Sequence, residues 1–144
     1  MNKTIKNLLI LAAIGLVIGL GVVYYIFNKP HRDVAGEKPS FKVEAKVLFK
    51  EYSANEMAGN EKYGDKVIQV TGKIVEIVKD STEVSIVLND EMEGVNCALN
   101  TKTVEENLNK INNFQVGDEV SLKGKCDGFD MIMGVVLTQC YLVK

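Results

Sequence analysis

The residues of this chain that could carry out acid–base chemistry are carboxylates that lie next to one another. These groups are Glu105-Glu106, Asp118-Glu119, and Asp90-Glu91 with Glu93. Two carboxylates divide the roles of general acid and general base only if they face one substrate, whereas neighbours in a helix or a turn point apart. The one histidine, His31, lies before the region that could form a core. The residue inventory therefore predicts a protein that is not an enzyme.

Three cysteines, Cys97, Cys126 and Cys140, are the remaining candidates for chemistry. A structural zinc site takes Cys and His ligands at short spacings such as CxxC, and this sequence contains no CxxC. One histidine in a linker does not complete such a set. We therefore predict no metal and no cofactor.

Charges are divided unevenly along the chain. Residues 1–40 hold five Lys or Arg and two acidic residues, which leaves residues 41–144 with twelve Lys, seventeen acidic residues, no Arg and a net charge of −5 (12 − 17). Because nucleic-acid affinity depends on clustered Lys and Arg that displace counterions, this balance disfavours strong binding of DNA or RNA. Lys73, Lys123 and Lys125 could still form a small basic patch, although spaced lysines usually just solvate a surface.

Residues 8–27 form an uncharged run of twenty residues, LLILAAIGLVIGLGVVYYIF. As a helix this run spans about 30 Å, the hydrocarbon thickness of a bilayer. A cleaved signal peptide usually has a shorter apolar core and small residues at its exit. Here the exit is bulky and includes Tyr24 and Tyr25, whose rings suit the membrane interface. We therefore predict a retained signal anchor over residues 1–27.

Basic residues flank the predicted anchor on both sides. Lys3 and Lys6 precede it, and Lys29, Arg32 and Lys38 follow it. The positive-inside rule therefore discriminates weakly, but signal-anchor logic places the short N-terminal side in the cytoplasm. We expect the C-terminal domain to be extracytoplasmic.

Two further features concern the anchor and the segment after it. Gly15 and Gly19 form a GxxxG, which suggests a helix-mediated homodimer, although glycine is simply common in membrane helices. Residues 28–40 contain both prolines and mixed charges, a composition typical of a flexible tether.

The part of the chain that could fold on its own, residues 41–144, begins with a helical pattern. Residues 41–65 have apolar side chains at helical spacing, and Ser53 with Glu56 forms a capping box that starts a second helical segment. The polar Asn55, Glu56 and Tyr63 are best explained by helices that cap one end of a barrel.

From residue 66 the apolar period changes to two, which predicts strands. These strands are expected at residues 66–78, 83–90, 94–100, 119–126 and 133–143, with a helix over residues 101–114 and turns at Gly117-Asp118 and Asp127-Gly128. Five strands with a helix between the third and the fourth is the order of an OB-fold. The fold class is therefore mainly β with helices (α+β), a five-stranded OB-fold barrel over residues 66–144. Gly72 and Gly124 lie where such a barrel needs tight coiling.

Short motifs in this order also resemble the membrane- or lipid-anchored OB-fold family called tRNA_anti-like. They are Tyr52, Asn55-Glu56, Ala58, Lys62-Tyr63, Val70-Thr71-Gly72, Val95 to Cys97, Gly117-Asp118, Leu122 to Gly128, Val136-Leu137 and Cys140. The resemblance implies an OB-fold, a role in nucleic-acid binding and no known catalysis.

OB-folds bind ligands on the outer face of their second and third strands. Here that face would expose Ser85, Val87, Asn89, Asn96 and Ala98, a pattern that an ordinary solvated sheet face also has. We therefore predict a non-catalytic binding module for a protein, peptide or glycan, with nucleic-acid binding as the alternative.

The cysteines can be placed once the fold is assumed. The third and fifth strands of an OB barrel are neighbours, so Cys97 and Cys140 could form a disulfide in an oxidising compartment. The alternative is that both are small buried apolar residues.

Overall fold

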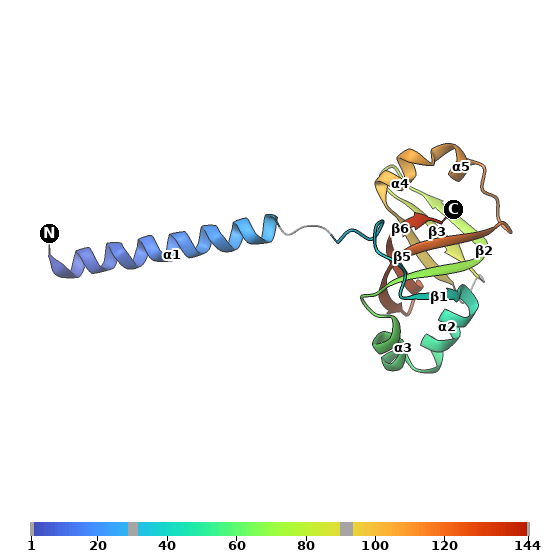
Figure 1. The fold of residues 1–144 in the computed structure, drawn as a ribbon, viewed down its shortest axis with the longest axis horizontal. Coiled ribbons are helices and arrows are strands. Elements are labelled where there is room, and N and C mark those ends of the chain that lie inside the picture. Colours follow the sequence, from blue (N-terminus) through green and yellow to red (C-terminus); the bar gives the residue numbers. More distant parts are fainter. Residues whose placement is uncertain (1, 29–31, 90–93, 144) are drawn as a thin grey trace. The chain divides into compact units, whose positions relative to one another are not determined.

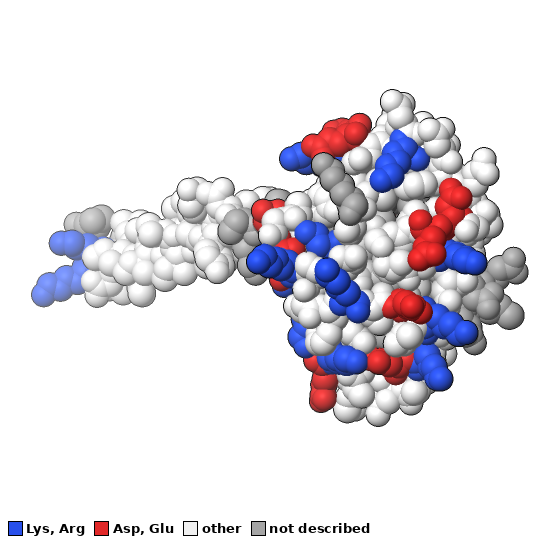
Figure 2. All heavy atoms as spheres, turned by 45° about the vertical axis from the view of Figure 1, so that its right-hand side comes forward, with Lys and Arg blue, Asp and Glu red and all other residues white. Residues whose placement is uncertain are grey.

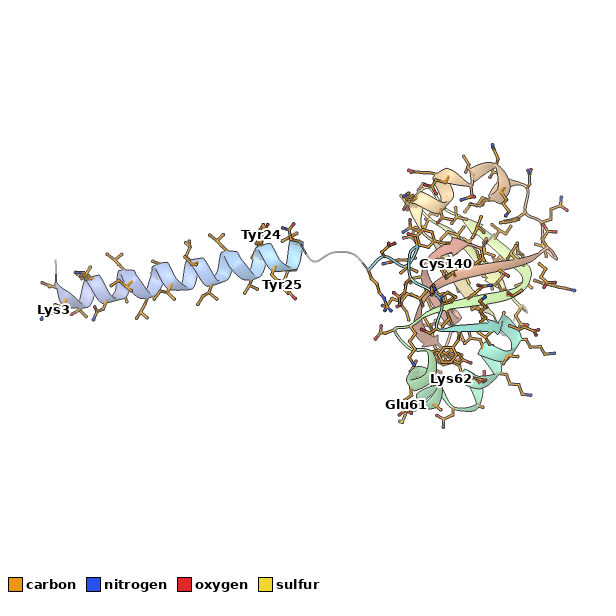
Figure 3. The ribbon with its side chains drawn as sticks, in the orientation of Figure 1. Lys3, Tyr24, Tyr25, Glu61, Lys62 and Cys140 are labelled. Carbon is orange, nitrogen blue, oxygen red and sulfur yellow. The ribbon has the colours of Figure 1, made fainter. Side chains whose placement is uncertain are left out.

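The computed structural model describes residues 2–28, 32–89 and 94–143, and the chain divides into two compact units at Arg32 and Asp33. The first unit contains helix α1 (Lys3–Phe27) (Figure 1). Within the described residues, α1 is the one helix that is long and apolar enough to cross a membrane, with a mean hydropathy of 2.5. Lys3 lies at its N-terminal end, and Tyr24 and Tyr25 lie in its last turn (Figure 3). The apolar helix expected over residues 8–27 is therefore confirmed.

The second unit is a closed barrel of OB type with added helices, as the order of the elements predicted (Figure 1). Its elements are β1 (Phe41–Glu44), α2 (Ala45–Ala54), α3 (Glu56–Tyr63), β2 (Val67–Lys79), β3 (Val84–Leu88), β4 (Val95–Leu99), α4 (Thr101–Glu106), α5 (Leu108–Asn112), β5 (Glu119–Asp130) and β6 (Gly134–Leu142). The five barrel strands are β2 to β6. The expected helix between the third and fourth of them is present as the two short helices α4 and α5.

One strand, β2, closes the barrel because its two halves pair with different neighbours. Residues 67–73 pair with β5, and residues 74–79 pair with β3. The register shifts between Ile74 and Glu76, where the strand changes partner. The parallel pairing of β4 with β6 and the antiparallel pairing of β5 with β6 complete the ring.

Alternation along the strands builds the core inside the ring. Every second residue of β3 and β4 is buried, and the residues between them are half-buried. Because side chains alternate between the two faces of a strand, this pattern places one face inside the barrel. The buried set includes Ile68, Ile74, Ile86, Leu88, Cys97, Leu122, Leu137 and Cys140.

Gly72 and Gly124, predicted where the barrel needs tight coiling, lie at places of close packing. A Cβ atom on Gly72 would lie 2.9 Å from the Cβ of Ala45, at the start of α2. A Cβ atom on Gly124 would lie 2.5 Å from the Sγ of Cys140 and 3.0 Å from the carbonyl oxygen of Thr138. The strands can therefore come this close only because both positions lack a side chain.

The structure corrects the start of the domain. Phe41–Glu44 is a strand that pairs in parallel with residues 68–71 of β2, so the helical pattern is wrong for these four residues. Backbone pairing with β2 and the packing of the Phe41 ring on Tyr63, 5.2 Å between centroids, outweigh the helical spacing. The capping box is also wrong, because the N-cap of α3 is Asn55, whose Oδ1 accepts from the Ala58 amide at 3.1 Å.

Two loop predictions are also corrected. Asp127 and Gly128 do not form a turn, since β5 runs through them to Asp130 with a register shift between Cys126 and Gly128, and Gly128 has a φ of 116°. The chain reverses instead at residues 131–133. A β-bulge accounts for the Asp-Gly pair, because glycine adopts positive φ without strain.

The predicted tether of residues 28–40 is partly packed on the barrel. Val34 is fully buried, and the Ser40 amide donates to the carbonyl oxygen of Val67 at 2.8 Å. Lys123 Nζ donates to the carbonyl oxygens of Ala35 at 2.6 Å and Glu37 at 3.0 Å. Residues 33–40 therefore belong to the domain, which leaves residues 28–32 between it and α1.

Gly124→Ala tests the close packing between β5 and β6. We expect a loss of about 1–3 kcal/mol in the free energy of unfolding, because the new methyl group overlaps Cys140 Sγ. Chemical denaturation of the purified protein measures this loss. In a double-mutant cycle, Cys140→Ala should offset part of it, since that substitution removes the overlapping sulfur. Additive effects of the two substitutions would contradict the overlap.

Candidate binding surface

The outer face of β3 and β4 brings together four of the five residues predicted for the ligand face. Ser85 lies opposite Ala98, and Val87 lies opposite Asn96. All four are half-buried, while Ile86 and Cys97 between them point into the core. We call these four residues the β3–β4 face.

The chemistry of the β3–β4 face is neutral and polar. Neither the Ser85 hydroxyl nor the side-chain amide of Asn96 makes a hydrogen bond within the described residues. Both groups can therefore bind a ligand or water. Val87 and Ala98 add small apolar contacts beside them. Because none of the four carries a charge, the face suits a neutral polar ligand better than a phosphate backbone.

Asn89, the fifth predicted residue, departs from this face. It follows the end of β3 with a φ of 95°, and its backbone N–H donates to the carbonyl oxygen of Lys73 at 3.0 Å. Asn89 and Lys73 therefore lie together, at a hollow of mixed charge where α2 begins. The lining of this hollow is Glu44, Ala45, Lys46, Thr71, Gly72, Lys73, Asn89 and Glu119.

The three predicted lysines do not form one basic patch. Lys73 lies opposite Glu119, whereas Lys123 lies opposite Gln69, four residues away along β2. Lys123 binds the carbonyl oxygens of residues 35 and 37. Lys125 pairs with Asp127 at 2.9 Å and with Asp65 at 3.2 Å, and these carboxylates raise the pKa of the Lys125 ammonium. Figure 2 likewise shows acidic and basic residues interspersed on the face in view.

The carboxylate pairs lie apart on the surface. Glu105 and Glu106 are exposed on α4, where Glu106 lies 3.8 Å from Lys102. The Asp118 carboxylate accepts a hydrogen bond from the backbone N–H of Gln115 at 2.9 Å, within the turn before β5. The Asp90, Glu91 and Glu93 group lies outside the described residues. In the described part of the chain, no three His, Cys, Asp or Glu side chains come close enough to hold a metal ion.

The three cysteines are fully buried free thiols. Cys97 and Cys140 lie in the core on the neighbouring strands β4 and β6, and burial raises the pKa of the Cys140 thiol well above its usual value. Cys126 Sγ lies 3.2 Å from the hydroxyl of Tyr52, and burial raises the pKa of Cys126 as well. The predicted Cys97–Cys140 disulfide is not formed in this structure, and the pairing stays a prediction for oxidised protein.

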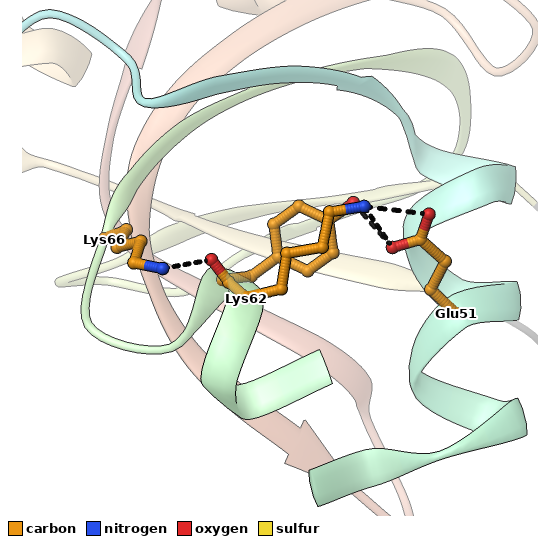
Figure 4. A network of polar contacts seen from close by, with 4 residues as sticks. Glu51, Lys62 and Lys66 are labelled. Atoms are coloured by element: carbon orange, nitrogen blue, oxygen red, sulfur yellow. Dashed lines mark hydrogen bonds and ion pairs between the residues drawn. The ribbon is translucent and has the colours of Figure 1, made fainter. Parts of the chain in front are cut away.

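A polar network fixes helices α2 and α3 to one another (Figure 4). Glu51 of α2 accepts from Lys62 at 2.9 Å and from the Tyr63 hydroxyl at 2.7 Å, both on α3. The hydrogen bond from Tyr63 lowers the pKa of the Glu51 carboxyl most, and the hydrogen bond from Lys62 lowers it further. Burial raises the pKa of the Tyr63 hydroxyl. These contacts support the expectation that the two helices form a cap on the barrel.

Glu51 is a residue that the sequence did not single out. Its partners are eleven and twelve residues away in the chain, on a second helix, so no spacing rule within one helix reveals the contact. The network is partly exposed, since the side chains of Lys62 and Glu51 are 45% and 38% accessible. It therefore joins the two helices close to the surface of the domain.

Comparisons with known proteins agree with this architecture. The family model described as tRNA_anti-like matches residues 1–141. Among solved structures, one similar chain is a "putative nucleic acid-binding lipoprotein" from Klebsiella pneumoniae subsp. pneumoniae, with a TM-score of 0.57 and 16% identity over 80% of this chain and 99% of that chain. At this identity the likeness shows the fold alone. No curated protein matches the sequence.

Other solved structures match a little more than half of the chain. Asparaginyl-tRNA synthetase from Pyrococcus horikoshii has a TM-score of 0.44 and 14% identity, over 56% of this chain and 19% of that enzyme. The S. pombe Stn1–Ten1 complex has a TM-score of 0.41 and 14% identity, over 54% of this chain and 58% of the matched chain.

Glu51→Gln tests this network between α2 and α3 through its pH dependence. Since the folded-state pKa of Glu51 is depressed, its contribution to stability is present above the unfolded pKa near 4.5 and is lost as the pH falls below it. We expect Glu51→Gln to cost about 0.5 kcal/mol at neutral pH, because the carboxyl is partly exposed, and less at acidic pH. Denaturation curves at both pH values measure the difference.

The matched control for this prediction is Glu61→Gln. Glu61 is exposed on α3, and its side chain makes no hydrogen bond within the described residues (Figure 3). This variant should leave the stability unchanged at both pH values. A Glu51→Gln effect that persists at acidic pH would contradict a contribution from the ionised carboxylate.

Proposed function

We propose that this chain, which belongs to the tRNA_anti-like family, is a single-pass membrane-anchored OB-fold protein that binds a protein, peptide or glycan without catalysing a reaction. The observation that carries this proposal is the uncharged β3–β4 face, where the Ser85 hydroxyl and the Asn96 amide have no partner within the described chain. OB-folds bind ligands on this face. The four side chains offer hydrogen bonds and small apolar contacts, which suit a neutral surface.

The membrane part of the proposal rests on α1. This helix has 25 residues, and a membrane span needs about 20. Tyr24 and Tyr25 at its C-terminal end suit the interface, and the lysines at its N-terminal end suit the cytoplasmic side. The Klebsiella pneumoniae protein of similar fold is named a lipoprotein. We propose that the barrel is extracytoplasmic.

Nucleic-acid binding is the second candidate function. The family name and the name of the Klebsiella pneumoniae protein favour it. The charges oppose it, because residues 41–144 carry a net charge of −5 and Lys123 and Lys125 are bound within the molecule. Single-strand binders also stack bases on exposed aromatic rings. Here Phe114 and Phe129 are half-buried against the core, so they do not form such a platform.

The membrane topology can be tested with one introduced thiol. Ser40→Cys places a cysteine at an exposed position of the domain, while the three native cysteines are fully buried and should remain silent. We expect a membrane-impermeant maleimide to label this variant in intact cells.

Asn2→Cys, at an exposed position before α1, is the matched control and should be labelled only after lysis. The reverse pattern would place the domain in the cytoplasm and overturn the proposed orientation. Nucleic-acid binding would then become the favoured function.

The two candidate functions also differ in their salt dependence. We expect the full chain to bind a fluorescent single-stranded RNA or DNA oligonucleotide more weakly than about 100 µM at physiological salt, as measured by anisotropy. Saturable binding with a steep salt dependence would favour the second function instead.

A matched pair of charged substitutions tests the face itself. The full chain can be screened for binding on a peptide or glycan array. Ala98 lies on the β3–β4 face, so Ala98→Arg should abolish the signal of any peptide or glycan that the unsubstituted chain binds. Gln69→Arg, on the outer face of β2 and β5, should leave that signal unchanged. Equal losses in both variants would contradict the assigned face.

A further inference from the structure

The connection between β5 and β6 exposes three apolar side chains in a row. Met131 is 95% exposed, Ile132 is 94% exposed and Met133 is 49% exposed. We call these three residues the hairpin tip. A run of three exposed large apolar residues is costly for a soluble surface unless another molecule covers it.

The backbone of the hairpin tip is fixed from within. Asp130 Oδ1 accepts from the amides of Ile132 at 2.7 Å and Met133 at 2.9 Å, and Gly134 completes the turn with a φ of 74°. These amides lower the pKa of the Asp130 carboxyl, which therefore stays ionised and keeps accepting. The tip thus presents apolar side chains, and two of its backbone amides already have an acceptor, which lowers the cost of contact with an apolar environment.

The attachment of the domain keeps a bilayer within reach of this tip. Residues 33–40 are packed on the barrel, so only the five residues 28–32 separate the domain from α1. Fully extended, five residues reach about 18 Å. A linker of this length holds the bilayer that contains α1 close to the domain.

We propose that the hairpin tip inserts Met131 and Ile132 into the headgroup–acyl boundary of the membrane that holds α1. This inference rests on the membrane anchor of the proposed function and adds a second contact to it. The bilayer is the occupant because the tether keeps it at high local concentration, which lets a small apolar contact form. The contact is apolar and does not require anionic lipid, in keeping with the acidic domain.

The contact would orient the ligand face. Val95 at the start of β4 pairs with Val135, two residues after the tip, whereas the connection between β2 and β3 lies at the opposite end of β3 and β4. With the tip in the membrane, the start of β4 would lie near the bilayer and residues 80–83 would lie far from it. A ligand on the β3–β4 face would be held beside the bilayer surface.

Site-specific fluorescence in phosphatidylcholine nanodiscs tests the insertion with the full chain. The variant Ile132→Cys carries an environment-sensitive NBD probe, and Thr82→Cys, exposed at the opposite end of the barrel, is the matched control. The native cysteines are buried and should not be labelled. We expect a blue-shifted and several-fold brighter emission at residue 132 than at residue 82, with quenching by a nitroxide carried near the top of the lipid acyl chain.

Two further measurements separate the possible failures. An NBD probe on Ile14→Cys in α1 reports whether the anchor lies in the membrane. Lipid-like emission at residue 14 together with water-like emission at residue 132 would overturn the tip contact and leave the anchor unaffected. Both probes in water overturn the anchor as well. The NBD emission at residue 132 should stay bright when phosphatidylglycerol is added to the nanodiscs. It should fall when Met131→Ser is added. That substitution alters an exposed side chain and should not affect folding. Emission at residue 132 equal to that at residue 82 would overturn the membrane contact and mean that the tip serves a partner absent from the nanodisc.

Discussion

The double pairing of β2 is the constraint on which the rest of this domain depends. One half of the strand pairs with β5 and the other half pairs with β3, so a single continuous segment joins the two sides of the barrel. Two glycines make the closure possible, because Gly72 admits the start of α2 and Gly124 admits Cys140. The apolar sides of all five barrel strands then face one enclosed space, in which the core residues lose their contact with water.

The added elements of the domain attach to this barrel. Strand β1 extends the sheet from β2, and α2 and α3 pack beside it, joined by the Glu51 contacts with Lys62 and Tyr63. Residues 33–40, which precede β1, are bound by Lys123 on β5. Lys62 and Lys123 are therefore engaged within the domain. The neutral β3–β4 face and the apolar hairpin tip remain exposed, and the proposed contacts rest on these two surfaces.

The sequence predicted features that depend on local periodicity. Twenty uncharged residues predict a membrane-length helix because every backbone group in the bilayer must be satisfied within the helix. Alternation at residues 84–88 and 95–99 predicted strands and their inward faces. The order of the elements was enough to predict the OB-fold. Four of the five residues predicted for a ligand face share one sheet face, as the alternation indicated.

Long-range contacts decided the rest. Phe41–Glu44 has helical spacing but pairs with β2, and Asp127-Gly128 has the composition of a turn but forms a bulge inside β5. Two of the three lysines expected to form a basic patch are bound within the domain, Lys123 to the carbonyl oxygens of residues 35 and 37 and Lys125 to Asp65 and Asp127. Sequence by itself determined the long apolar helix, the order of the five barrel strands and the polarity of their faces, because these follow from the period of apolar residues. Only the tertiary structure decided which polar groups are already paired and which apolar groups stay exposed, because these depend on partners brought together by closure of the barrel.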